Sequence, residues 1–276
     1  MGRNMTSNEV RGRTAVVTGA SSGIGQAVAE HLGALGAKVW MCGRTEEPLQ
    51  ESCVAIEGSG GSADYSVFDI SDISVLRSFI QDASAADGLH VMVNNAGFGD
   101  ADGILTGDPE SWRSMLDVNV VALAAGAQAA VAAMRTAGSE GHIINISSIA
   151  ALRRDSGMYG ATKHAVNAVN ATLREELEDD LIRVTSIMPG VFATNFIRNM
   201  DRAMVEAFAG SVGITDLSFD DQGRLSREQN ADLQRRLAPM VGDVNAIARA
   251  VEYVITQPID LNIEEIVIRP RKSLPL

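Results

Sequence analysis

Short runs of β-branched residues alternate along this chain with longer segments whose apolar residues recur at helical spacing. Short apolar runs bounded by turns are typical of strands buried on both faces, and such strands belong to parallel sheets. The alternation therefore predicts an α/β fold in which helices cover both faces of a parallel sheet. The predicted strands are Thr14–Thr18, Lys38–Cys42, Ala63–Phe68, Leu89–Val93, a run that begins at Ile143, and Glu265–Ile268. The predicted helices are Gln26–Leu35, Glu46–Ile56, Asp72–Ala85, Pro109–Met134, Gly157–Asp180 and Val244–Thr256.

Composition excludes several classes of partner. The 276 residues carry 23 basic and 35 acidic side chains, a net charge of −12, which disfavours nucleic acid and anionic membrane surfaces. No apolar run has the length of a membrane span, and residues 1–10 lack the apolar segment of a signal peptide. The histidines are scattered and the two cysteines, Cys42 and Cys53, have no histidines nearby at ligand spacing, so we expect reduced thiols, no metal and a cytoplasmic protein.

A glycine-rich turn follows the first predicted strand. It reads Gly19-Ala-Ser-Ser-Gly23-Ile-Gly25 and leads directly into a helix. Glycines in this context allow a tight turn and the close approach of a pyrophosphate, which the helix N-terminus attracts. A glycine-rich loop alone is weak evidence, because tight turns often contain glycine. With both flanking elements present, the turn predicts a dinucleotide site.

The end of the second predicted strand bears on the choice of cofactor. NAD sites usually carry an acidic residue there, which binds the ribose hydroxyls, whereas an arginine suits the extra phosphate of NADP. Here Gly43 removes the acid and Arg44 supplies a guanidinium. The sequence thus favours NADP(H) over NAD(H). For Asp69, after the third strand, two interpretations stay open: a contact with the adenine amino group, or a neighbour of the next helix N-terminus.

Tyr159 and Lys163 are separated by one helical turn, and Ser148 follows the strand that begins at Ile143. A phenol has an ordinary pKa of about 10, and a nearby ammonium lowers that pKa by roughly one to three units. Tyr159 could then exchange a proton with an alcohol or carbonyl whose oxygen Ser148 holds by hydrogen bonding. The alternative is a tyrosine that anchors a helix beside a solvated lysine, since this spacing also occurs by chance.

The motifs together resemble those of the short-chain dehydrogenase/reductase family, over about residues 13–271. The resemblance rests on the glycine-rich turn, Asn94-Asn95-Ala96-Gly97, Asn119, Ser148, Tyr159-x-x-x-Lys163 and Pro189-Gly190. It implies a single Rossmann-like, doubly wound domain with a seven-stranded parallel sheet. The end of the chain, from Thr256 to Pro270, resembles the NADP-dependent hydroxy-acid and carbonyl reductase branch of the family.

The resemblance also implies roles for individual residues. Tyr159 would be the acid/base, Lys163 would lower its pKa and bind the nicotinamide ribose, Ser148 would bind the substrate oxygen, and Asn119 would hold a water that links Lys163 to a proton relay. Phe192 and Met200 would join Ser148 and Tyr159 in contacting substrate. The expected cofactor-binding residues are Gly19, Ser21, Ser22, Gly23, Ile24, Gly25, Arg44, Asp69, Ile70, Asn95, Ala96, Gly97, Tyr159, Lys163, Pro189, Gly190, Val191 and Thr194.

Two departures from the family pattern affect the serine loop. The segment between Ser148 and Tyr159 is about two residues shorter than is usual, and Ala151 replaces a frequent glycine. Either Ser147 or Ser148 could then face the substrate, and we favour Ser148. The short loop also places Arg153 and Arg154 near the site, where they could pair with a substrate carboxylate, be solvated, or contact a second subunit.

The expected domain spans residues 13–271, between a disordered tail at 1–12 and a short tail at 272–276. Within it, residues 194–239 would form a substrate lid with a methionine-containing face, or an ordinary surface helix. Relatives usually pair their long helices as homodimers or homotetramers. The predicted function is hydride transfer between NADP(H) and a small-molecule secondary alcohol or carbonyl compound. Hydroxy acids are among the candidate substrates. The alternatives are a non-catalytic, NADP(H)-binding regulatory protein and an epimerase or dehydratase on the same scaffold.

Overall fold

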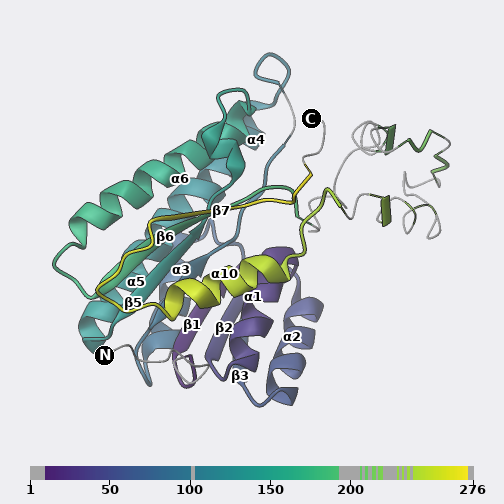
Figure 1. The fold of residues 1–276 in the computed structure, drawn as a ribbon. Coiled ribbons are helices and arrows are strands. Elements are labelled where there is room, and N and C mark those ends of the chain that lie inside the picture. Colours follow the sequence, from purple (N-terminus) through teal and green to yellow (C-terminus); the bar gives the residue numbers. More distant parts are fainter. Residues whose placement is uncertain are drawn as a thin grey trace.

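The computed structural model describes residues 10–100, 103–192 and 239–272, together with isolated positions between 206 and 236. In this part of the chain, parallel strands form one seven-stranded sheet in the order β3-β2-β1-β4-β5-β6-β7 (Figure 1). The strands are β1 (Thr14–Thr18), β2 (Lys38–Gly43), β3 (Ser62–Val67), β4 (Val91–Asn94), β5 (Gly141–Ile146), β6 (Ile182–Pro189) and β7 (Glu265–Ile268). The predicted doubly wound α/β fold is confirmed.

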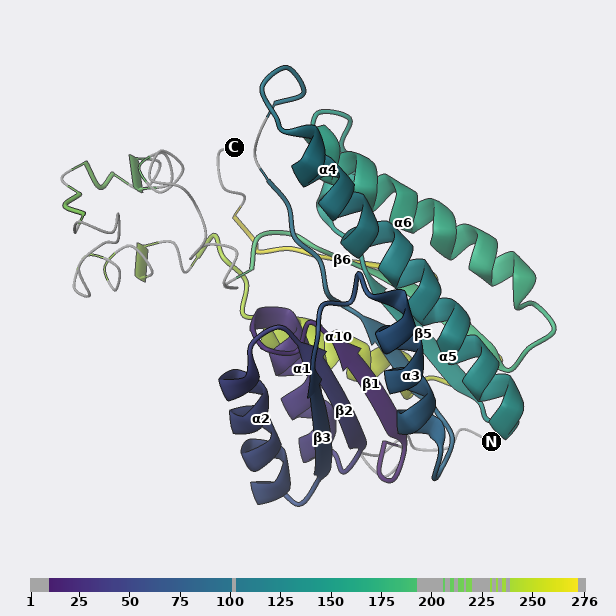
Figure 2. The same ribbon diagram turned by 180° about the vertical axis from the view of Figure 1, so that it is seen from behind.

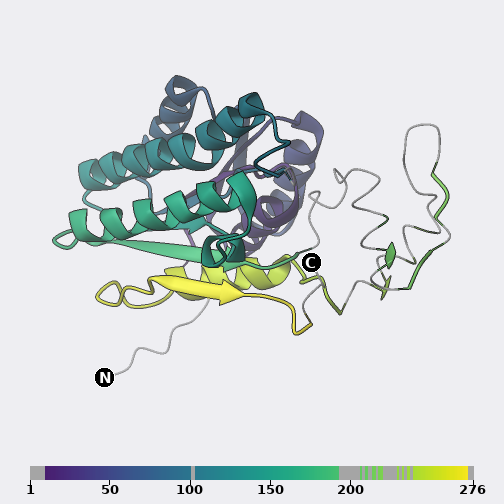
Figure 3. The ribbon, with the colours of Figure 1, turned by 90° about the horizontal axis from the view of Figure 1, so that it is seen from above.

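Two layers of helices cover the sheet. Helices α1, α2 and α10 lie on one face (Figure 1), and α3, α4, α5 and α6 lie on the other (Figure 2). Their bounds are α1 (Gly23–Ala34), α2 (Glu46–Gly58), α3 (Ile73–Ser84), α4 (Pro109–Leu116), α5 (Leu123–Ala137), α6 (Gly157–Glu176) and α10 (Asn245–Ile255). Strand β7 forms one edge of the sheet, as Figure 3 shows, and β3 forms the other.

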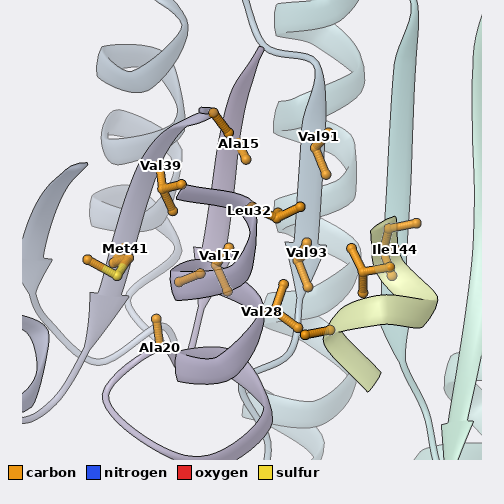
Figure 4. Packing of buried hydrophobic residues seen from close by; sticks show 14 of the residues in the cluster. Ala15, Val17, Ala20, Val28, Leu32, Val39, Met41, Val91, Val93 and Ile144 are labelled. Carbon is orange, nitrogen blue, oxygen red and sulfur yellow. The ribbon is translucent and has the colours of Figure 1, made fainter. Parts of the chain in front are cut away.

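The core lies on both faces of the central strands because neighbouring strand residues point to opposite faces. Val17 packs with α1, whereas its neighbour Val16 packs on the other face near α3. Figure 4 shows the first of these clusters, where side chains of β1, β2, β4 and β5 meet Val28 and Leu32 of α1. Each fully buried side chain of this kind contributes about 1.5–3 kcal/mol to stability. Strands buried on both faces explain why the sequence shows continuous apolar runs.

The order of the strands reverses between β1 and β4. From β1 the chain moves outward through β2 to β3, and it then returns to place β4 on the other side of β1. The loops that follow β1 and β4 therefore diverge to opposite faces. In an open parallel sheet this reversal leaves a crevice at the carboxyl ends of the strands.

The structure differs from the predictions at several element boundaries, and it contains two short helical segments that the sequence did not reveal. Val10 is buried in the core and Gly12 N donates to Gly36 O at 2.9 Å, so the disorder predicted over residues 1–12 is wrong for residues 10–12; residues 1–9 and 273–276 lie outside the described part. The helix predicted over Pro109–Met134 extends to Ala137 and is interrupted by a π-helical segment, η2 (Asp117–Ala122). A short 3₁₀ helix, η3 (Ile149–Leu152), lies in the serine loop, where periodicity gave no signal.

The combined helix from Pro109 to Ala137 is long and apolar enough to cross a membrane, contrary to the expectation that no segment is. Half of its most apolar window is buried inside the structure. The buried residues of α5 pack with α3 and the sheet, and Arg135 near its end forms an ion pair with Asp180. The helix is therefore apolar because one side of it packs in the protein core. Cys42 and Cys53 are free and buried, and burial raises the pKa of Cys42 to about 12.

Candidate active site

A cleft of about 570 Å³ opens at the carboxyl ends of the strands, where the strand order reverses. Pockets of about 300–1,000 Å³ hold drug-sized ligands. Most residues predicted to bind a cofactor line this one cleft, although they lie at or after the ends of five different strands or on α6. They are Gly19, Ser21, Ser22, Gly23, Ile24, Arg44, Asp69, Ile70, Asn95, Ala96, Gly97, Tyr159, Lys163, Pro189, Gly190 and Val191. Ser148 and Phe192 line it too.

Two predicted residues that the structure describes, Gly25 and Asn119, do not line the cleft, and two others lie outside the described residues. Gly25 lies behind the cleft, where a Cβ atom would come 2.4 Å from Asn95 Nδ2 and from Gly19 O, so its role is close packing. Asn119 is fully buried away from the cleft. Thr194 and Met200 lie outside the described residues, as does most of the lid predicted over 194–239.

The glycine-rich turn between β1 and α1 is fixed by the loop after β4. Asn95 Nδ2 donates hydrogen bonds to Thr18 O at 2.9 Å and to Gly19 O at 3.2 Å. Gly19 has a φ of +66°, and a Cβ atom there would lie 2.8 Å from Ala96 Cα. Helix α1 has no acidic residue in its first turn, and the side chain of Ser22 makes no cap hydrogen bond. Backbone amides at this N-terminus are therefore arranged to bind an anionic group.

The end of β2 is packed too closely for an acidic side chain. A Cβ atom on Gly43 would lie 2.9 Å from Ser21 Oγ in the glycine-rich turn. Next to it, Arg44 is exposed on the wall of the cleft. Asp69 accepts hydrogen bonds from Ser71 N at 3.0 Å and Ser71 Oγ at 2.8 Å, which hold its pKa below the ordinary value. Asp69 lines the cleft, and its carbonyl oxygen also accepts a hydrogen bond at 3.0 Å from the amide of Asp72, the N-cap of α3.

Tyr159 and Lys163 project from the first turns of α6 toward β5. Lys163 is 4% exposed, and its Nζ atom donates a hydrogen bond to Ile146 O at 2.9 Å. The same atom lies 5.8 Å from the centre of the Tyr159 ring. Gly97 makes room for this group, because a Cβ atom there would lie 3.0 Å from Asn119 Oδ1 and 3.5 Å from Lys163 Nζ.

Burial dominates the protonation of the two groups. It lowers the pKa of Lys163 from 10.5 to about 8, because an ammonium loses hydration in the protein interior. Burial also raises the pKa of Tyr159 above its ordinary value, and a hydrogen bond from Ser148 offsets part of that rise. The sequence predicts that Lys163 lowers the tyrosine pKa. In the structure it is Ser148 that lowers it, and the net direction is upward.

The two serines after β5 have different surroundings. Ser147 is buried, and its hydroxyl donates to Asn167 Oδ1 of α6 at 2.8 Å. Ser148 is partly exposed, accepts a hydrogen bond from Ala150 N at 3.1 Å as the N-cap of η3, and interacts with the Tyr159 hydroxyl. Of the two hydroxyls, that of Ser148 faces the tyrosine.

The side chain of Asn119 holds a loop in place. Its Nδ2 donates to Phe98 O at 2.8 Å and to Thr162 Oγ1 at 3.0 Å, and its Oδ1 accepts from Phe98 N at 3.0 Å. Both amide protons are thus used within the protein. These bonds assign the side chain a structural contact, and the expectation that Asn119 holds a water of a proton relay stays a prediction. Asn119 joins the loop after β4 to α6, close to Tyr159, whose carbonyl accepts from Thr162 Oγ1 at 2.8 Å.

Arg153 lines the cleft, whereas Arg154 does not. The Arg153 guanidinium forms a bidentate ion pair with Asp155, with Nε and Nη2 at 2.9 and 3.0 Å from the carboxylate oxygens. Both side chains are exposed. The pair places a guanidinium at the mouth of the cleft but leaves it partly neutralised by its neighbour.

Several residues of the cleft have no counterpart among the predictions. Gly99 is the most informative, because a Cβ atom there would lie 2.6 Å from Tyr159 Cδ2. A second glycine two residues after Gly97 was a sequence signal for such close packing. Further lining residues are Phe68, Phe98, Val118, Ile149, Ala150 and Ser156. Among the described residues, no group of three or more His, Cys, Asp or Glu side chains is placed to hold a metal ion.

The family model described as short chain dehydrogenase matches residues 13–204. An uncharacterized oxidoreductase of Staphylococcus aureus is 34% identical over 261 residues, which are 94% of this chain and 97% of the relative. A metagenomic short-chain oxidoreductase, solved in complex with NADP, is 30% identical with a TM-score of 0.72 and covers 96% of this chain and 100% of its own. A putative 2-deoxy-d-gluconate 3-dehydrogenase from Agrobacterium tumefaciens, solved with bound NADP, is 27% identical with a TM-score of 0.73, covering 94% and 95%.

Proposed function

This chain belongs to the short-chain dehydrogenase family and is an oxidoreductase, and from that premise we propose that it reduces a carbonyl compound to a secondary alcohol with NADPH, reversibly. The observation that carries the proposal is the convergence of Ser148, Tyr159 and Lys163 on the same cleft as the glycine-rich turn. One cleft thus holds a proton donor, a hydrogen-bond donor for the reacting oxygen and a cradle for a dinucleotide.

The residues present fit a nicotinamide dinucleotide. Gly19 and Gly43 keep the floor of the cleft free of side chains, and the N-terminus of α1 offers backbone amides without a competing carboxylate. NADP(H) is favoured because Arg44 can bind the additional phosphate and because Gly43 leaves no room for an acid that would select NAD(H). The solved relatives named above that contain NADP support the same choice. When bound, this cofactor supplies or accepts the hydride.

The protein's own groups would then handle the proton. Ser148 Oγ would donate a hydrogen bond to the substrate oxygen, and Tyr159 Oη would give that oxygen its proton during reduction or remove it during oxidation. Burial raises the pKa of Tyr159, which stabilises the protonated phenol, the form that donates a proton during reduction. Lys163, held by Ile146 O, places positive charge behind the tyrosine.

Oxidation of NADPH, followed by nicotinamide absorbance, tests the proposal. A panel of ketones, aldehydes, oxo acids and sugars would be compared for the parent protein and Tyr159→Phe, with Tyr65→Phe as a matched control outside the cleft. Turnover that Tyr159→Phe abolishes and Tyr65→Phe retains is the expected result. Tight NADPH binding without turnover on any panel member would contradict the proposal and favour a cofactor-binding regulatory protein. Cofactor retained through substrate conversion without net redox change would instead favour an epimerase or dehydratase.

The proposal extends to assembly and location. Short-chain dehydrogenases typically form oligomers, and we expect a homodimer or homotetramer in the cytoplasm. Small residues along α5, such as Ala125, Ala129 and Ala132, would allow close contact between helices of two copies. Light scattering of the purified protein would test this, and a monomer at the concentration of the activity assay would contradict it.

A further inference from the structure

A second hollow of about 380 Å³ adjoins the cleft. The two cavities share Ile149, Arg153, Gly190 and Val191 as walls. The second hollow extends from these residues toward the end of β7, away from the glycine-rich turn. A substrate whose reacting oxygen lies at Ser148 would thus have a continuous path from the catalytic end of the cleft into the hollow.

The walls of the hollow combine apolar surface with positive charge. Leu152, Val267 and Pro270 supply apolar surface, while Arg153, Arg269 and Lys272 are the charged residues that line it. Among the residues that the structure describes, no acidic side chain lines the hollow. Arg153 is paired with Asp155, but among the described residues neither Arg269 nor Lys272 forms an ion pair. Two available cations here contrast with a chain of net charge −12.

The backbone that carries Arg269 is fixed by the sheet. Gly190 N, at the end of β6, donates to Ile268 O of β7 at 2.7 Å. A Cβ atom on Gly190 would lie 2.8 Å from Arg269 Cβ, so the glycine lets the arginine approach the cleft. Arg269 is therefore presented from the end of a strand, which holds its position better than a free loop would.

We propose that the hollow binds the anionic end of an amphipathic substrate, a carbonyl compound or alcohol whose apolar chain ends in a carboxylate or phosphate. This inference rests on the proposed function, because the reacting oxygen is placed at Ser148 and Tyr159. The apolar chain packs on Leu152 and Val267, and the anionic group pairs with Arg269 and Lys272. Neutral carbonyl compounds of the same length lack this pairing and bind more weakly.

The test compares three methyl ketones of equal chain length that end in a methyl group, a carboxylate or a phosphate. Each is assayed with the parent protein, Arg269→Gln, Lys272→Gln and Arg271→Gln; Arg271 is an exposed cation between the other two that does not line the hollow. We expect KM for an anionic ketone to rise roughly two- to fivefold in each of the first two variants, with kcat unchanged, because exposed charge pairs contribute modestly. The neutral ketone should be unaffected. The carboxylate and phosphate arms identify which anion the hollow prefers.

A binding measurement separates this inference from the redox proposal. Octanoate and octyl phosphate should raise the melting temperature of the parent protein and of Arg271→Gln, but not of the double variant Arg269→Gln/Lys272→Gln, while octanol has no effect. That pattern supports anion binding in the hollow even if none of the ketones is reduced. The inference is overturned if Arg271→Gln loses the rise in melting temperature as the double variant does, or if neutral and anionic ketones have equal KM in the parent protein. The redox function still stands in either case if turnover depends on Tyr159.

Discussion

Replacement of Gly99 by alanine tests whether catalysis depends on the position of the Tyr159 ring. The added Cβ atom would lie 2.6 Å from Tyr159 Cδ2 and 2.8 Å from Cγ, against ordinary contacts of 3.4–4 Å. The ring or the loop after β4 must therefore shift by about 0.8 Å, the difference between 3.4 and 2.6 Å. A misplacement of about 1 Å can cost about 100-fold in rate. We expect kcat to fall about 10- to 100-fold and overpacking to cost about 1–3 kcal/mol of stability.

The assay is kcat from NADPH oxidation, with NADPH affinity and melting temperature measured on the same samples. Gly103→Ala is the matched control, since its Cβ atom would meet nothing nearer than Thr106 Oγ1 at 3.5 Å. A Gly99→Ala protein that keeps kcat within twofold of the parent would refute the reasoning, and so would a loss explained by weaker NADPH binding alone.

Three further predictions concern the cofactor, the buried lysine and the loop. Arg44→Ala should weaken NADPH binding about 10- to 100-fold and leave NADH binding unchanged, because the loss is that of a charge-assisted bond to phosphate; equal NADPH and NADH affinities in the parent protein would remove the argument for NADP(H). Because the Lys163 pKa falls from 10.5 unfolded to about 8 folded, the unfolded chain binds more protons between these values, so stability from this residue rises with pH there. The difference in free energy of unfolding between the parent and Lys163→Met should therefore shift by roughly 3 kcal/mol in favour of the parent from pH 8 to pH 10.5. A difference that does not change with pH would contradict the burial of an ammonium. Asn119→Ala should lower the melting temperature and kcat together by freeing both backbone groups of Phe98, at about 1–3 kcal/mol for each unsatisfied group; hydrogen exchange confined to the loop after β4 would check the cause.

The fold was predictable because its signals are local. Strands buried on both faces must be apolar along their whole length, and the turn after β1 must contain glycine because Ala96 and Asn95 approach it closely. These requirements can be recognised in short stretches of sequence. The same holds for Tyr159 and Lys163, whose spacing alone places them on one face of α6.

The parts that escaped prediction depend on contacts between distant residues. The π-helical segment η2 adds a residue to one helical turn, which changes apolar periodicity too little to be noticed. Asn119 bonds to Phe98, 21 residues away, and Ser147 bonds to Asn167, 20 residues away. Nothing in the spacing of either pair reveals its partner. The direction of the Tyr159 pKa likewise follows from burial, which the sequence pattern does not give.

The face of α6 that covers β5 carries polar side chains, although apolar side chains at these positions would gain more free energy from burial. Tyr159 and Lys163 are followed on it by Asn167, which accepts from Ser147 of the serine loop and from Ser186 of β6, and by Asn170, which accepts from Asn145 of β5. Buried polar groups add little net stability, but each is destabilising when its partner is lost. Sliding α6 by one turn along β5 would leave Asn145 and Ser147 unpaired, whereas an apolar face could slide and repack. The polar pairs thus fix the position of α6 along β5. They thereby also fix the separation between the Tyr159 and Ser148 hydroxyls, which both have to reach the same substrate oxygen.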